Sequence, residues 1–100
     1  MKKGYYIIEK NFRSLSGEID IIAFDPISRT IIFVEVKLRK ENSQVSPEES
    51  ITPAKIKKIK RTAIEFLQKK QIKYNAIRFD FIGITTENGK EIINHIENAF

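Results

Sequence analysis

The chain has 100 residues, of which 41% are hydrophobic and 31% charged, and its formal net charge is +5. These values are typical of one globular domain spanning residues 1–100, and they exclude an intrinsically disordered chain. No stretch approaches the roughly 20 apolar residues of a membrane span. The sequence contains no cysteine, which excludes disulfides and thiolate metal sites and predicts a cytoplasmic location.

The first half of the chain has the pattern of three strands. Met1–Gly4 places lysines before a glycine, as at the end of a helix, and residues 5–11 then follow as a strand. Further strands are expected at 17–25 and 30–39, because turn-forming residues at 25–29 separate two β-branched and aromatic runs.

The second half begins with helix signals. Ser46–Glu49 has the spacing of a capping box and predicts a short helical turn. The main helix is expected to begin at Thr52–Pro53 and to end near Lys70, because its apolar residues recur with the helical period. Strands are then expected at 76–84 and 91–96. This order predicts an α/β fold with a five-stranded mixed sheet and one long basic helix.

Basic residues concentrate in the expected helix. Residues 53–73 hold eight bases and one acid, Glu65, whereas the rest of the chain is mildly acidic. Such a basic face suggests a polyanionic partner. A solvated helix face that keeps the protein soluble is the alternative, and charge alone does not separate the two interpretations.

Charged residues interrupt the two central strands at Glu18, Asp20, Glu35 and Lys37. Burying a carboxylate costs several kcal/mol unless a cation or hydrogen bonds compensate it. Pairing the strands across the 25–29 turn sets Asp20 opposite Glu35, and the same register sets Glu18 opposite Lys37. The four charged side chains are therefore expected on one face of the sheet.

The alternate residues of these strands form an apolar face: Ile19, Ile21, Ala23, Ile32, Val34, Val36 and Leu38. Both faces of the sheet are therefore expected to be covered by other layers. Arg78 and Asp80 are expected to form a structural ion pair. His95 is expected to be structural as well, with no group nearby that forms a dyad with it.

Two carboxylates on facing strands repel each other unless a positive group lies between them. Mg²⁺ suits Asp20 and Glu35, since it takes one or two carboxylates and completes its coordination with water and phosphate oxygens. Lys37 would then orient an attacking water or stabilise charge in the transition state. A buried ion cluster without a metal, in which Lys37 neutralises one acid, is the alternative.

The segments Gly17–Asp20 and Phe33–Lys37, with Arg39 shortly after, resemble the motif of the PD-(D/E)XK nuclease superfamily. That superfamily includes restriction endonucleases and archaeal Holliday-junction resolvases. Over essentially its full length the chain is more closely similar to the YraN-like bacterial family. The other matching segments are Gly4–Tyr5, Glu9–Asn11, Ser46–Glu49, Lys55, Arg78–Asp80 and Asn98–Phe100.

The resemblance implies a single endonuclease-like domain with a restriction-endonuclease-like fold. It implies that Asp20 and Glu35 bind Mg²⁺ or Mn²⁺, with the carbonyl of Val36 as a third ligand and Lys37 as the catalytic lysine. Two further positions match the family and are expected to support the site, Glu18 and Lys55.

The implied activity is hydrolysis of phosphodiester bonds in DNA, including branched recombination or repair intermediates. The residues expected to contact nucleic acid are Arg39, Lys40, Lys57, Lys58 and Arg61. A nucleic-acid-binding module without catalysis is the alternative, and it predicts salt-sensitive binding that survives Glu35→Ala. A purely structural or protein-binding domain is a third possibility.

Members of this family usually begin with an extra helix that carries an acidic residue. The chain begins where that helix should end, so the N-terminal helix is expected to be missing. Its absence would expose apolar sheet surface and favour a homodimer.

Overall fold

The computed structural model describes residues 4–39 and 51–100. Its elements are β1 (Tyr6–Ser14), β2 (Gly17–Asp25), β3 (Thr30–Arg39), α1 (Pro53–Lys69), β4 (Ala76–Glu87) and β5 (Lys90–Ile96). The bounds expected for β2 and β3 are confirmed, whereas β1 and β4 each extend three residues beyond their expected ends. The helix end expected at Met1–Gly4 falls mostly outside the described residues, and the turn expected at Ser46–Glu49 falls wholly outside them.

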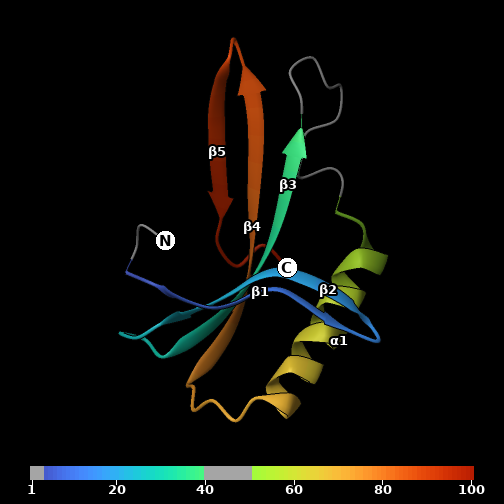
Figure 1. Cartoon of the computed structure of the whole chain (residues 1–100), viewed down its shortest axis with the longest axis vertical. Helices are drawn as coiled ribbons and strands as arrows, with labels where there is room; N and C mark the ends of the chain where they lie inside the picture. The colour runs from blue at the N-terminus through green and yellow to red at the C-terminus, as the bar shows by residue number, and fades with distance from the viewer. Residues whose placement is uncertain (1–3, 40–50) are drawn as a thin grey trace.

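The strands form one sheet in the order β1-β2-β3-β4-β5 (Figure 1). The β3–β4 pair is parallel, and the other three pairs are antiparallel. The expected mixed five-stranded sheet with one helix is therefore confirmed within the described ranges. No helix in those ranges is long and apolar enough to cross a membrane.

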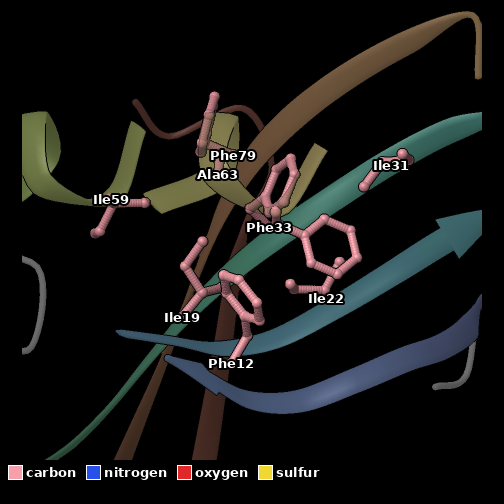
Figure 2. Close-up of a cluster of buried hydrophobic side chains, with 9 residues drawn as sticks. Phe12, Ile19, Ile22, Ile31, Phe33, Ile59, Ala63 and Phe79 are labelled. Atoms are coloured by element: carbon pink, nitrogen blue, oxygen red, sulfur yellow. The ribbon is translucent and has the colours of Figure 1, made fainter. Parts of the chain in front are cut away.

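Helix α1 begins at a side-chain cap and packs on one face of the sheet. The Thr52 hydroxyl accepts a hydrogen bond from the backbone N–H of Lys55 at 3.2 Å, and Pro53 occupies the first turn. Figure 2 shows the cluster of buried side chains that this helix shares with the strands. Phe66 meets Phe12 and Phe33 edge-on, with ring centroids 5.2 and 6.0 Å apart.

The β1–β2 hairpin is kinked in the middle. The register shifts between Ile7 and Glu9, and further along the ladder lacks the pair of Asn11 and Asp20, where Asn11 has a left-handed φ of 52°. The regular alternation of faces is interrupted there. Ile19 consequently packs with Phe12 beneath α1, so its expected place on the other face is wrong.

The second face of the sheet is less covered than the sequence predicted. A small buried cluster of Ala23, Ile32 and Val34 lies there, and no helix of the described residues covers it. Leu38 and Ile93, which flank Ile84 on this face, are each 65% exposed. The expectation that both faces are covered is therefore wrong for the described part of the chain.

A buried polar cluster around Asp80 lies on this second face. The Asp80 side chain is completely buried and accepts hydrogen bonds from Arg78 Nε at 2.8 Å and from the Asn98 backbone N–H at 3.0 Å. Burial would raise the pKa of Asp80, but these bonds, with Arg78 foremost, hold it below its ordinary value. The expected Arg78–Asp80 ion pair is confirmed.

His95 contributes to the same cluster. Its Nε2 lies 2.7 Å from Asp80 Oδ2, so the expectation that no group pairs with His95 is wrong. No local pattern of residues indicates this contact, because it forms only when β4 and β5 pair Ile82 with His95. This cluster lies on the face opposite Glu35, since Asp80 is registered with Val34.

We expect Asp80→Ala to lower the free energy of unfolding by about 3–5 kcal/mol, because it leaves the Arg78 guanidinium without its buried partner. Glu91→Ala is the matched control, since Glu91 is exposed on β5, and its effect should stay within about 0.5 kcal/mol. Denaturant unfolding of both variants checks this, and equal stabilities would contradict the structural role of Asp80.

Candidate functional site

The candidate site begins where β2 separates from β3. The two strands pair from Asp25–Thr30 to Ile21–Val34, in the register that the sequence predicted, and the ladder then stops. Beyond this point Asp20 Oδ2 accepts a hydrogen bond from the Val36 backbone N–H at 2.8 Å. A side chain thus replaces the backbone acceptor that a continued ladder would supply.

Asp20 and Glu35 come together at this point, as the sequence predicted. Glu35 is half-buried, and its burial, a side-chain hydrogen bond with Asp20 and repulsion from that carboxylate raise the pKa of Glu35 to about 8. Lys37 and Lys55 act in the opposite direction. Two carboxylates so close to each other need a shared proton or a cation between them.

Two lysines from different elements form the basic side of the site. Lys55, in the first turn of α1, lies close enough to Lys37 that the positive charge of Lys37 lowers the pKa of Lys55. Arg39 lowers it further, and Glu35 raises it. Lys55 was expected only to support the site, and the structure brings it together with Glu35, Lys37 and Arg39.

A pocket of about 200 Å³ lies beside these groups. Its lining residues are Gly17, Glu18, Glu35, Lys55, Lys58 and Ile59. Glu18 reaches its rim but does not pair with Lys37 as expected. Glu18 instead accepts a hydrogen bond from Arg13 Nε at 3.0 Å, because the β2–β3 ladder ends before Glu18 and its β1 partner is Arg13.

The residues expected to contact nucleic acid are only partly gathered at the pocket. Lys58 lines it, and Arg61 lies one turn further along α1, near Glu65. Lys57 lies about 160° around the helix from the buried Ile59, at 100° per residue, so it points away from the sheet. Lys40 lies outside the described residues.

Arg13 is a residue that the sequence reasoning missed. It is exposed, it pairs with Glu18, and it lies at the end of the hairpin next to the pocket. The one available signal was the position of Arg13 across the expected hairpin from Glu18. To use that signal, the end of β1 had to be known, and the strand expected from the sequence ended three residues too early.

The donor atoms at the site suit a hard divalent cation. Among residues 4–39 and 51–100 no group of three or more acidic, histidine or cysteine side chains is arranged to hold a metal ion, so the site offers two carboxylates. Val36 adds a carbonyl, because the N–H and C=O of one strand residue point to the same neighbouring strand. Mg²⁺ accepts this set, since water and substrate oxygens normally complete its coordination.

The raised pKa of Glu35 makes stability depend on pH. The folded protein holds the Glu35 proton up to about pH 8, whereas an ordinary glutamate loses it near 4.5. This group therefore destabilises the fold increasingly as the pH rises through that window. Glu35→Gln removes the titration, so its melting temperature should exceed that of the wild type by an amount that grows from about pH 5 to pH 9.

Thermal unfolding in a chelator checks this expectation. Glu91→Gln is the control, because Glu91 is exposed on β5, outside the β2–β3 region, and its difference from the wild type should not vary with pH. If the curves of melting temperature against pH are parallel for Glu35→Gln and the wild type, the two carboxylates do not interact.

Comparison with known proteins gives consistent matches along the chain. The model of the uncharacterised protein family UPF0102 matches residues 1–84. A UPF0102 protein of Syntrophomonas wolfei is 44% identical over 99 residues, which cover 99% of this chain and 84% of the relative. Another, of Persephonella marina, is 48% identical over 97 residues, which cover 97% of this chain and 78% of the relative.

These matches confirm the similarity to the YraN-like family, whereas membership of the wider nuclease superfamily stays a prediction. The matched region includes both carboxylates of the candidate site, both lysines and the basic helix. The chain belongs to the uncharacterised protein family UPF0102.

Proposed function

We propose that this protein is a metal-dependent endonuclease that hydrolyses phosphodiester bonds in DNA and has a restriction-endonuclease-like fold. The observation that carries the proposal is the meeting of Asp20 and Glu35 with Lys37 and Lys55 beside one pocket. Opposed charges that perturb one another in a concave site are typical of catalytic centres.

In this proposal Asp20, Glu35 and the Val36 carbonyl hold Mg²⁺ or Mn²⁺. Such an ion, when bound, acts as a Lewis acid on a phosphoryl oxygen and lowers the pKa of water. Asp20 has one oxygen engaged with the Val36 N–H, which orients its other oxygen. The raised pKa of Glu35 in the metal-free protein means that a cation must displace its proton to bind.

The lysines act on the reacting phosphate. Water attacks phosphorus, the bond to the leaving oxygen breaks, and the leaving oxygen takes up a proton. The Lys37 ammonium group orients the attacking water or stabilises the negative charge that grows on the phosphoryl oxygens. Lys55 adds a second positive charge on the same side of the site. The two ammonium groups repel each other, and this repulsion favours the binding of an anion between them.

The basic side chains of α1 attract the nucleic-acid backbone. Lys58 lines the pocket and Arg61 follows it along the helix towards the β1–β2 turn. Contacts of this kind position the substrate without reading its sequence. The alternative function is binding without catalysis, and it is favoured by the finding of only two candidate carboxylate ligands in the described part of the chain.

A cleavage assay tests the proposal. With Mg²⁺ and fluorescently labelled DNA junctions or flaps, the wild type should cleave, and Lys37→Ala should be slower by about 10²–10⁴-fold. Asp20→Asn and Glu35→Gln should lose metal-dependent cleavage. Lys69→Ala removes the same charge at the far end of α1 and should keep the wild-type rate.

The outcomes of this assay differ for the two functions. Equal rates for Lys37→Ala and the wild type would contradict the catalytic assignment. Binding without cleavage at any concentration of Mg²⁺ or Mn²⁺ would establish the alternative.

Binding itself should depend on salt. We expect the affinity for DNA to fall steeply with rising salt, and Lys58→Ala or Arg61→Ala to reduce the slope by about one unit each, because each removes one phosphate contact. Titrations at several salt concentrations check this, with Lys69→Ala again as the control. If the salt dependence of binding has the same slope for these variants as for the control, α1 does not contact the DNA.

A further inference from the structure

The turn between β1 and β2 presents a leucine entirely to solvent. The turn consists of Leu15 and Ser16, and the Leu15 side chain is fully exposed, at 104% of its reference area. Burying a leucine stabilises a protein by about 1.5–3 kcal/mol, so this position contributes none of that to the fold. Single exposed apolar residues are common, and exposure alone assigns no role.

The turn that carries Leu15 is firmly attached to α1. The hydroxyls of Ser14 and Ser16, on either side of the leucine, donate hydrogen bonds to the two carboxylate oxygens of Glu65. The bond from Ser16 is 2.8 Å long. Gly17 lies so close to the helix that a Cβ atom there would come within 3.2 Å of the Thr62 hydroxyl oxygen. Both ends of the turn are therefore held against α1, beside which the turn lies in Figure 1.

The same turn borders the candidate site. Gly17 and Glu18 line both the pocket beside Glu35 and a second hollow of about 460 Å³ that runs along the turn past Leu15. Charged side chains of both signs lie near the leucine: Arg13 on β1 pairs with Glu18, Arg61 on α1 lies near Glu65, and Lys58 lies beside Gly17. A polyanion that spans the pocket and these cations would therefore meet Leu15.

We propose that Leu15 is a wedge that enters the base stack of the nucleic acid next to the phosphate bound in the pocket. The inference rests on the proposed function and specifies its substrate class. Apolar side chains inserted between bases unstack them at a cost of a few kcal/mol, and this cost is smallest where the bases are already unpaired or poorly stacked. The preferred substrate is thus DNA with a branch, flap or gap.

Nucleic acid fits this surface better than a protein partner does. One leucine between basic side chains is too small an apolar area for a stable protein interface, which needs roughly 1,200 Å² or more. A rigid apolar tip with flanking positive charges instead resembles the arrangement that minor-groove wedges use.

The experiment compares Leu15→Ala with Ile27→Ala. Ile27 is 92% exposed in the β2–β3 turn. The Ile27→Ala variant therefore removes a similar apolar side chain at a turn away from the pocket. The probe is a flap duplex with 2-aminopurine at the branch, bound with Ca²⁺ in place of Mg²⁺ so that binding is read without cleavage. A fully paired duplex of the same length serves as the reference substrate.

We expect the wild type and Ile27→Ala to raise the 2-aminopurine fluorescence severalfold on the flap. Leu15→Ala should lose most of this signal and bind the flap about tenfold more weakly, with little change on the paired duplex. Leu15→Phe should restore the signal, because a phenyl ring can also stack between bases. Thermal unfolding should give equal melting temperatures for all variants, since neither side chain is buried.

The outcomes separate this inference from the proposed function. If Leu15→Ala binds and unstacks the flap like the wild type, the wedge is overturned while the endonuclease proposal stands. If the wild type binds neither substrate at low salt, both are overturned. If Leu15→Ala changes only the oligomeric state, the turn is a protein contact and the wedge is overturned.

Discussion

The hydrogen bond from the Val36 N–H to Asp20 is the interaction on which the candidate site depends. An uninterrupted antiparallel ladder would satisfy this N–H with a backbone carbonyl of β2. Here the ladder ends at Ile21–Val34, and a carboxylate takes the place of the carbonyl. The backbone N–H at the edge of β3 thus has a hydrogen-bond acceptor, and the same contact brings Asp20 close to Glu35.

An irregularity in the β1–β2 hairpin accompanies this substitution. Asn11 adopts a left-handed conformation where Asp20 drops out of the β1–β2 ladder, and the β2–β3 ladder ends at the adjacent residue, Ile21. The outer half of the hairpin then lies on α1, where Ser14 and Ser16 bind Glu65. The pocket and the attached turn therefore lie on the same side of this irregularity.

The buried carboxylates on the two faces of the sheet have different surroundings. Asp80 is fully buried, yet Arg78, His95 and the Asn98 backbone N–H satisfy it, so its pKa is lowered and the cluster is structural. Glu35 is half-buried, and its pKa is raised by this burial and by the neighbouring carboxylate of Asp20. Polar groups that are fully satisfied stabilise a fold, whereas unresolved repulsion between like charges is typical of a site that awaits a ligand.

The sequence by itself determined the main elements, the β2–β3 register and the approach of Asp20 to Glu35 that follows from it. The turn at Asp25–Arg29 and the alternation of residues were sufficient to set Asp20 beside Glu35, because antiparallel neighbours connected by a short turn have few alternative registers. The main helix was equally evident from its Thr52 cap and apolar period. These signals are local, and local signals can be read from one chain.

The tertiary structure alone decided what depends on contacts between distant segments. The place of Ile19 beneath α1, the pairing of Glu18 with Arg13 and the contact of His95 with Asp80 all differ from the sequence-based expectation. Each depends on where a strand bends or which strand becomes its neighbour. Lys55 belongs to the site for the same reason, since packing of Ile59 and Phe66 on the sheet brings the first turn of the helix close to Glu35 and Lys37. Such packing is a property of the whole core, and residue patterns along the chain do not encode it locally.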